Sequence, residues 1–176
     1  MSAFLKKLAR RRVPLGFACG VAVLWLARPT PRLLWTGLAV ACVGEALRVW
    51  AAGHLEKSRE VTQSGPYRWT RHPLYVGSTI MGVGLAMASS SAIVAVIVIA
   101  YLAMTLTAAI RTEEAFLRQA FGDAYDRYRA GATPAVSRQF SVERAMRNRE
   151  YRAATGLVLA SLLLILRMWL RDTYGA

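Results

Sequence analysis

The chain has few of the residues that build disulfide frameworks and metal sites. Its two cysteines, Cys19 and Cys42, both lie within apolar stretches, which supports neither a disulfide framework nor a cysteine-based metal site. The two histidines, His54 and His72, do not occur in an HxxH or HExxH arrangement, which also argues against a metal. No Gly-x-Gly-x-x-Gly stretch is present, so nothing in the sequence points to a dinucleotide fold.

Acidic residues are also scarce. Asp and Glu number 10 against 23 Lys and Arg, which gives a formal net charge of +13. The basic residues lie between apolar runs and accompany no recognition motif, so we expect no nucleic-acid partner and attribute the charge to membrane topology and anionic lipid headgroups. Because 55% of the residues are hydrophobic and only 19% are charged, the composition excludes an ordinary soluble domain and indicates a membrane protein.

The apolar runs predict about five membrane-spanning helices. Residues 92–110 hold no charge over 19 positions, close to the roughly 20 that a helix needs to cross a hydrocarbon core. Four weaker candidates are residues 13–27, 33–52, 73–88 and 153–170. Since lipid leaves unpaired backbone groups unsatisfied, each segment must be helical or shielded by protein. The sequence therefore predicts an all-α integral membrane helical bundle, built as a single domain from residues 1–176.

The basic residues also predict how this bundle is oriented. In the five-helix arrangement, 18 of the Lys and Arg residues lie on one side, in residues 1–12, 53–72 and 111–152, whereas Arg28, Arg32 and Arg171 lie on the other. Lys and Arg favour the cytoplasmic side. We therefore expect a multi-pass protein whose N-terminus and two long polar segments are cytoplasmic.

Ser89-Ser90-Ser91 leaves almost no linker between the third and fourth predicted helices. These helices are therefore expected to form an antiparallel hairpin. Gly77, Gly82 and Gly84 would permit close packing there, because small residues let helix backbones approach.

Two polar stretches flank this hairpin. Arg71 and His72 precede Pro73, which suits the first position of a helix, so both are expected at the positive end of the third helix. Glu113 and Glu114 follow the fourth helix and return to the same membrane face. Cationic groups, a helix N-terminus, aromatic rings and a carboxylate suit a zwitterionic, purine-bearing ligand better than a metal.

Structural roles are the alternative for several of these residues. His72 could cap the third helix, and Glu113 and Glu114 could form a solvated turn paired to Arg111 or Arg118. Glu45 and Arg48, three residues apart, could be an intramembrane ion pair or pocket residues. His54, with no partner evident in the sequence, is interpreted as an interfacial residue.

The motif Arg-His-Pro-Leu-Tyr-Val-Gly at residues 71–77, followed after one hairpin by Glu113-Glu114, resembles the isoprenylcysteine carboxyl methyltransferase and phospholipid methyltransferase family of integral membrane enzymes. The resemblance covers about residues 44–136. It implies S-adenosylmethionine as cofactor and a membrane lipid, a lipophilic small molecule or a prenylated substrate as partner, with the active site on the cytoplasmic face. By position, the implied cofactor-binding residues are Tyr67, His72, Pro73, Leu74, Tyr75 and Glu113, with residues 60–62 as a further wall. Glu114 and Arg71 are the candidate catalytic residues.

One position departs from the family pattern. Isoprenylcysteine enzymes carry an arginine for the substrate carboxylate four residues before the first glutamate of the pair, whereas this chain has Ala109. Arg111 lies about 200° further around the helix, so it is not an obvious replacement. The acceptor, a carboxylate or a lipid amine, and the oligomeric state stay open at this point.

Two other function classes are compatible with the sequence. One is a membrane reductase of the sterol-reductase type that uses NADPH. The other is a non-catalytic membrane scaffold that keeps the motif for folding alone. Binding of S-adenosylmethionine would separate both from a methyltransferase.

Overall fold

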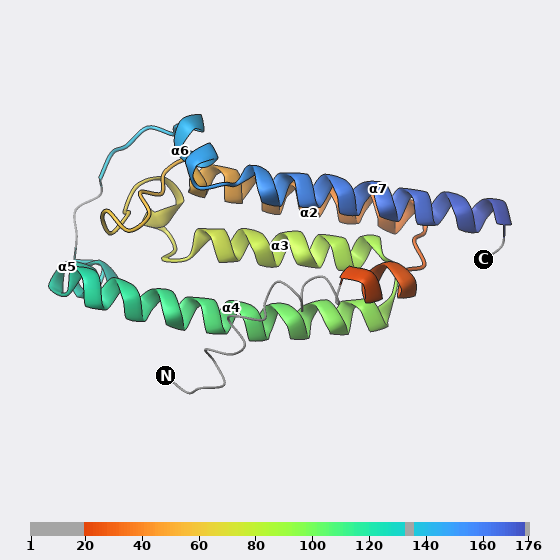
Figure 1. Ribbon diagram of the computed structural model, residues 1–176, viewed down its shortest axis with the longest axis horizontal. Helices are drawn as coiled ribbons and strands as arrows, with labels where there is room; N and C mark the ends of the chain where they lie inside the picture. Colours follow the sequence, from red (N-terminus) through yellow and green to blue (C-terminus); the bar gives the residue numbers. More distant parts are fainter. Residues whose placement is uncertain (1–19, 133–135, 175–176) are drawn as a thin grey trace.

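The computed structural model describes residues 20–132 and 136–174, which form helices joined by turns and loops. Residues 20–26 are helical. The named helices that follow are α2 (Pro31–Ala52), the short 3-10 helix η1 (Gly65–Arg68), α3 (Pro73–Ala88), α4 (Ala92–Phe121), α5 (Asp123–Arg129), α6 (Val142–Arg147) and α7 (Tyr151–Tyr174). In Figure 1, α2, α3, α4 and α7 run along the long axis, with α3 between α2 and α4 and with α7 against α2. The described part of the chain is all-helical, as the sequence predicts.

Three helices are long and apolar enough to cross a membrane: α2, α4 and α7, of 22, 30 and 24 residues. The chain is therefore a multi-pass membrane protein. Helix α3 spans the predicted residues 73–88, but its 16 residues reach only about 24 Å, less than the roughly 30 Å of a hydrocarbon core. The predicted first span, residues 13–27, begins outside the described residues.

Helix α4 continues 11 residues beyond the predicted end at residue 110, to Phe121. At a rise of about 1.5 Å per residue, Glu113 lies about 32 Å from the start of α4, roughly the thickness of a hydrocarbon core. Gly122, with a φ of +47°, separates α4 from α5. A positive φ is available to glycine without strain, so the chain turns sharply there.

Helices α2 and α3 touch through their backbones along a seam of four glycines. Gly37 and Gly44 lie seven residues apart on α2, and Gly77 and Gly84 lie seven apart on α3. A Cβ placed at Gly44 would lie 2.4 Å from the backbone nitrogen of Met81, and one at Gly84 would lie 2.4 Å from that of Ala41. Each glycine is therefore required by the close approach of the two helices.

The expectation that three glycines pack the α3–α4 hairpin is correct only for Gly82. A Cβ at Gly82 would meet Leu102 of α4 at 2.5 Å. For Gly77 and Gly84 the expectation was wrong, because both face α2. Sequence spacing reveals the small residues but not which neighbouring helix they contact.

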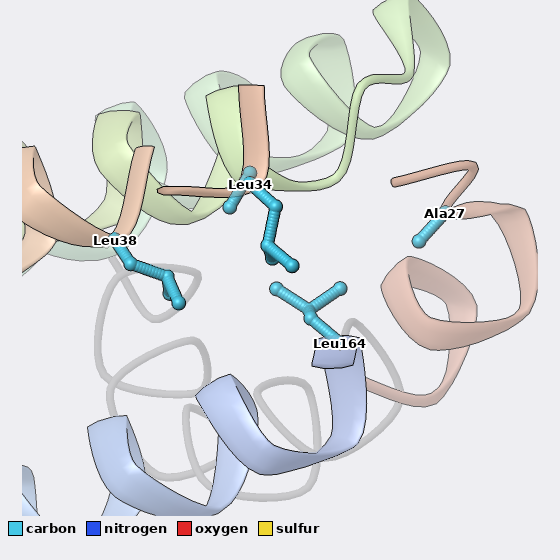
Figure 2. Packing of buried hydrophobic residues seen from close by; sticks show 5 residues of the cluster. Ala27, Leu34, Leu38 and Leu164 are labelled. Atoms are coloured by element: carbon cyan, nitrogen blue, oxygen red, sulfur yellow. The ribbon is translucent and has the colours of Figure 1, made fainter. Parts of the chain in front are cut away.

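Helix α7 packs against α2 through an apolar cluster at the end of the bundle that carries the α3–α4 turn. Figure 2 shows Leu34 and Leu38 of α2 pointing toward Leu164 of α7, with Ala27 beside them. Leu34 is 0% exposed and Leu164 is 2% exposed. Burial of such side chains stabilises the fold by about 1.5–3 kcal/mol each in water, and dispersion contacts take over this role in lipid.

A charged cluster joins α2, α3 and the start of α7. Arg48 Nε lies 2.7 Å from a Glu150 oxygen and 3.4 Å from a Glu45 oxygen. The Arg48 guanidinium also donates to the Ser78 hydroxyl on α3. The ion pair that was one of two interpretations of Glu45 and Arg48 is therefore present, with Glu150 as a third member that the sequence did not indicate.

Candidate functional site

A cavity of about 420 Å³ lies at the end of the bundle opposite the α3–α4 turn. In Figure 1 this is the left end, where α5 and the loop between α2 and α3 meet the extended part of α4. The wall is shared by that loop, the first turn of α3, α4 and α5. The hairpin thus brings together stretches about forty residues apart in the sequence.

Five of the eight predicted site residues line this cavity: Tyr67, Arg71, Leu74, Tyr75 and Glu113. The predicted wall at residues 60–62 also lines it. The other three, His72, Pro73 and Glu114, lie behind the lining. Pro73 is buried at the first position of α3, and His72 precedes it as the cap residue, although its side chain makes no capping hydrogen bond. The structure therefore places the predicted set in two layers.

An ion-pair network joins the lining residues to the second layer. His72 Nε2 and Arg71 reach the same Glu114 oxygen, at 3.2 and 3.3 Å. On the opposite edge of the imidazole ring, His72 Nδ1 lies 3.9 Å from a Glu113 oxygen. Glu114 is therefore paired across the hairpin rather than with Arg111 or Arg118. Because Arg71 and His72 hold Glu114, the end of α4 is tied to the start of α3.

Tyr67 is buried, and its phenol stays protonated. Burial, followed by the nearby Glu113 carboxylate, raises the pKa of Tyr67 well above its usual range. The hydroxyl of Tyr128 on α5 donates to the Tyr67 carbonyl oxygen at 2.8 Å. Burial also raises the pKa of Tyr128, to about 12, so this donor keeps its proton at physiological pH.

Several lining residues from the end of α4 and from α5 were not predicted as site residues. They include Phe116, Leu117, Tyr125 and Tyr128. Leu117, Tyr125 and Tyr128 recur with Phe121 at three- and four-residue intervals in the sequence, a spacing that predicts an amphipathic helix facing the membrane or the bundle but not a site. The turn at Gly122 brings these residues to the site, because it folds α5 back so that Tyr125 and Tyr128 line the cavity.

The loop between α2 and α3 is held by the segment before α7. Arg138 forms a two-pronged ion pair with Glu60, at 2.6 and 2.9 Å, and the Asn148 amide donates to the Ala52 and Leu55 carbonyls at 2.9 Å. Arg144 donates to the Gly53 carbonyl at 2.8 Å. Bidentate and charge-assisted contacts of this kind restrict geometry as well as adding energy. The cavity wall at residues 55–62 is thereby positioned by the C-terminal part of the chain.

His54 lies at the start of this loop, and the expectation that it has no partner was wrong. It is 4% exposed, and its Nδ1 lies 3.2 Å from the Ser64 hydroxyl. Burial, together with the charges of Arg144, Arg138 and Arg68, lowers its pKa.

This lowered pKa predicts an acid-sensitive fold. Below the unfolded-state value of about 6.5, the unfolded chain binds a proton that the folded chain does not, so stability falls as the pH drops. We expect thermal unfolding in detergent to show a smaller loss between pH 7.5 and 5.5 for His54→Gln than for the unmodified protein. Equal losses in the two proteins would show that His54 is not the group responsible.

Among the described residues, no group of three or more His, Cys, Asp and Glu side chains could hold a metal ion. The donor set of the cavity is three carboxylates (Glu56, Glu60 and Glu113), one guanidinium and one ammonium group, hydroxyls and aromatic rings. Such a set suits an organic zwitterion.

Residues 34–124 match the phospholipid methyltransferase family. The chain belongs to this family. The match covers α2, α3, α4 and the intervening loop, which together supply most of the cavity wall. Members of this family are S-adenosylmethionine-dependent membrane methyltransferases with lipid or isoprenylcysteine substrates.

The chain is similar in sequence to curated proteins that are named for metal resistance and for isoprenylcysteine methylation. This chain is 38% identical over 119 residues to the cobalt-zinc-cadmium resistance protein CzcN of Cupriavidus metallidurans. The match covers 65% of this chain and 53% of the relative. It is 35% identical to the nickel-cobalt-cadmium resistance protein NccN of Alcaligenes xylosoxydans xylosoxydans, covering 69% and 55%. It is also 30% identical to the protein-S-isoprenylcysteine O-methyltransferase of Schizosaccharomyces pombe, covering 53% and 45%.

The chain spans about half the length of the curated relatives it matches. No solved structure matches it.

Proposed function

We propose that the protein is an S-adenosylmethionine-dependent methyltransferase that acts on a lipophilic, membrane-embedded acceptor. The observation that carries this proposal is the cavity itself, which Tyr67, Arg71, Leu74, Tyr75 and Glu113 line together although two separate stretches of chain supply them. Four of these five positions are ones that the family resemblance assigns to the cofactor pocket, and the fifth, Arg71, is a candidate catalytic residue.

The composition of the cavity suits this donor. Its volume of about 420 Å³ falls within the range of small-molecule sites. Glu113 offers a carboxylate to the donor's cationic groups, and Arg71 and Lys57 offer cations to its carboxylate. The rings of Tyr67 and Tyr75 offer apolar faces to a purine or a sulfonium.

The chain's own residues have a limited task in this reaction. The donor, when bound, supplies an activated methyl group, so the protein must align the acceptor and exclude water. Apolar lining residues such as Leu74, Ala108 and Phe116 serve the exclusion. A carboxylate acceptor needs no general base. An amine acceptor needs one, and the two candidates, Glu114 and His72, lie directly behind the cavity lining.

The structure bears on the acceptor through Ala109. The position that carries the carboxylate-binding arginine in isoprenylcysteine enzymes lines the cavity here as an alanine, whereas Arg111 is exposed and outside the lining. The cation for a prenylcysteine carboxylate is therefore missing at this point of the wall. This favours an acceptor that presents no free carboxylate there, such as a lipid amine.

The arrangement relative to the membrane is part of the proposal. We place the cavity at the cytoplasmic surface, because residues 53–72 and 111–152 hold most of the basic side chains outside the N-terminal stretch. Five membrane helices would result if α3 and the segment that includes residues 20–26 both cross. A polar donor would then enter from the cytoplasm and a lipophilic acceptor from the bilayer.

Calorimetric titration of the detergent-solubilised protein tests the function. We expect S-adenosylmethionine and its demethylated product to bind, and NADPH not to bind. Binding of NADPH alone would instead indicate a membrane reductase, and binding of none of the three would favour a non-catalytic scaffold. Transfer of a radiolabelled methyl group to extracted membrane lipids, but not to water-soluble acceptors, tests the acceptor class.

Tyr128→Phe is expected to weaken donor binding by about three- to tenfold, because it removes one hydrogen bond to the Tyr67 carbonyl and loosens that wall. The exposed Tyr151 lies outside the cavity, so Tyr151→Phe is the matched control. Calorimetry on both variants measures the difference. An unchanged affinity in Tyr128→Phe would show that this hydrogen bond does not position the site.

A further inference from the structure

A second cavity, of about 710 Å³, lies at the opposite end of the bundle. Its wall includes Arg28, which precedes α2, Ser90 and Ser91 of the α3–α4 turn, and Arg167 and Arg171 of α7. Figure 1 shows these elements at the right end, where α7 and the start of α4 lie near the first described helical residues. The family match over residues 34–124 contains neither Arg28 nor the two α7 arginines.

The three arginines are unusual for this end of the molecule. Of the 23 basic residues, 18 lie in residues 1–12, 53–72 and 111–152. Three of the remaining five line this cavity. Asp172 is the only carboxylate in residues 20–40, 84–100 and 160–174, and it is exposed and outside the lining. Within the described residues, no ion pair joins a carboxylate to Arg28, Arg167 or Arg171.

One nitrogen of these guanidinium groups is both buried and without a hydrogen-bond partner in the described part of the chain. The Nε of Arg167 is buried and has no hydrogen-bond partner among the described residues. A cation on a membrane helix costs free energy unless it pairs with a counter-charge, so a partner is expected for Arg167. The three arginines repel one another as well, so the cavity as it stands favours an anion.

The neighbouring serines do not supply that anion. The Ser91 hydroxyl accepts from the backbone of Val94 at 3.4 Å and caps α4, and the Ser90 hydroxyl lies 3.1 Å from the backbone nitrogen of Thr30. The attraction therefore rests on the three guanidinium groups rather than on the end of a helix. Trp25, 80% exposed beside this cavity, is the kind of side chain that lies at the level of lipid headgroups.

We propose that this cavity is a binding site for a phosphate-bearing anion, the headgroup of an anionic phospholipid. Arginine forks bind phosphate oxygens in pairs, and the cavity lies at a helix-bundle end where headgroups are within reach. The bound lipid would fasten α7 to the α3–α4 turn. This site is independent of the methyl-transfer chemistry at the other end.

Native mass spectrometry of the delipidated full-length protein, titrated with phosphatidylglycerol or phosphatidylcholine, tests the proposal. The variant combines Arg28→Gln, Arg167→Gln and Arg171→Gln. Its control carries the same charge change at exposed positions outside the cavity, Arg32→Gln, Arg147→Gln and Arg152→Gln. We expect about a fivefold loss of phosphatidylglycerol affinity per arginine removed from the cavity, thus roughly hundredfold in the triple variant, and no comparable loss in the control.

A second arm distinguishes a lipid from free phosphate. Inorganic phosphate is compared with chloride at equal ionic strength in thermal unfolding. Stabilisation by phosphate that the triple variant loses, without phosphatidylglycerol binding, supports the anion site with a soluble occupant. Equal phosphatidylglycerol affinity in the triple variant and its control, with no phosphate effect, overturns the proposal. If the triple variant does not fold, Arg171→Gln against Arg32→Gln gives the same decision, with a fivefold loss expected.

Discussion

Replacing Glu113 with glutamine is expected to weaken S-adenosylmethionine binding roughly hundredfold while leaving the protein folded, because it removes the one α4 carboxylate that lines the cavity. Glutamine has nearly the same shape as glutamate, so the packing of α4 is preserved. The side chain of Glu113 is 40% exposed, and its ion-pair partner among the described residues is His72 at 3.9 Å, so little structural energy depends on its charge. The loss is therefore expected in ligand affinity rather than in stability.

Calorimetry with S-adenosylmethionine and its demethylated product measures this effect. Glu143→Gln, an exposed glutamate in the first turn of α6 and outside the cavity, controls for the loss of one negative charge. A larger loss for the methyl donor than for its product would indicate that Glu113 faces the sulfonium. Undiminished affinity of Glu113→Gln for both ligands would remove this residue from the proposed site.

Replacing Gly44 or Gly84 with alanine is expected to destabilise the fold by about 3 kcal/mol or more, at the upper end of overpacking effects. Each new Cβ would lie 2.4 Å from a backbone nitrogen of the facing helix, Met81 or Ala41 respectively. A backbone cannot move aside as a flexible side chain can, so α2 and α3 must separate. The Arg48 cluster joins the same two helices and would be strained by that separation.

Gly156→Ala is the matched control for this seam. Gly156 lies within α7, is exposed, and would have nothing within 4 Å of its Cβ. There we expect no loss and a gain of up to about 1 kcal/mol from helix propensity. Thermal unfolding in detergent, followed by circular dichroism, is expected to show a fall of several degrees for the seam variants only. Equal melting temperatures for all three variants would contradict the contact between α2 and α3.

The helical segments were largely predictable. Pro73 and the three serines at 89–91 mark both ends of α3 in the sequence. Helix α2 begins two residues before its predicted span and ends where predicted, and α7 extends its predicted span by two residues at the start and four at the end. The extension of α4 to Phe121 was not predicted as part of the span. The apolar stretch ends where the charged residues begin, but the helix propensity of the residues stays high beyond that point. Residues 111–121 are good helix formers, so the helix continues beyond the apolar stretch.

The residues that meet at the site were predictable from the order of the motifs along the chain. Motif order placed Arg71 and His72 opposite Glu113 and Glu114, and the hairpin required them to meet. It could not show that Glu114 pairs with Arg71 and His72 while Glu113 lines the cavity, because adjacent helical residues point about 100° apart and the neighbours decide which faces inward. The methyltransferase function and the roles of these residues remain proposals that the binding experiments test.

By itself, the sequence determined the membrane class, the family and the hairpin that unites the motif, since hydropathy, charge and motif order are properties of the linear chain. Only the tertiary structure decided which helix each glycine faces, that Glu150 joins Glu45 and Arg48, and that Tyr125 and Tyr128 return to the cavity. The same holds for the second cavity, whose Arg28 and Arg171 lie more than a hundred residues apart in the chain. Contacts of this kind depend on how helices rotate and cross, and local sequence patterns do not encode that geometry.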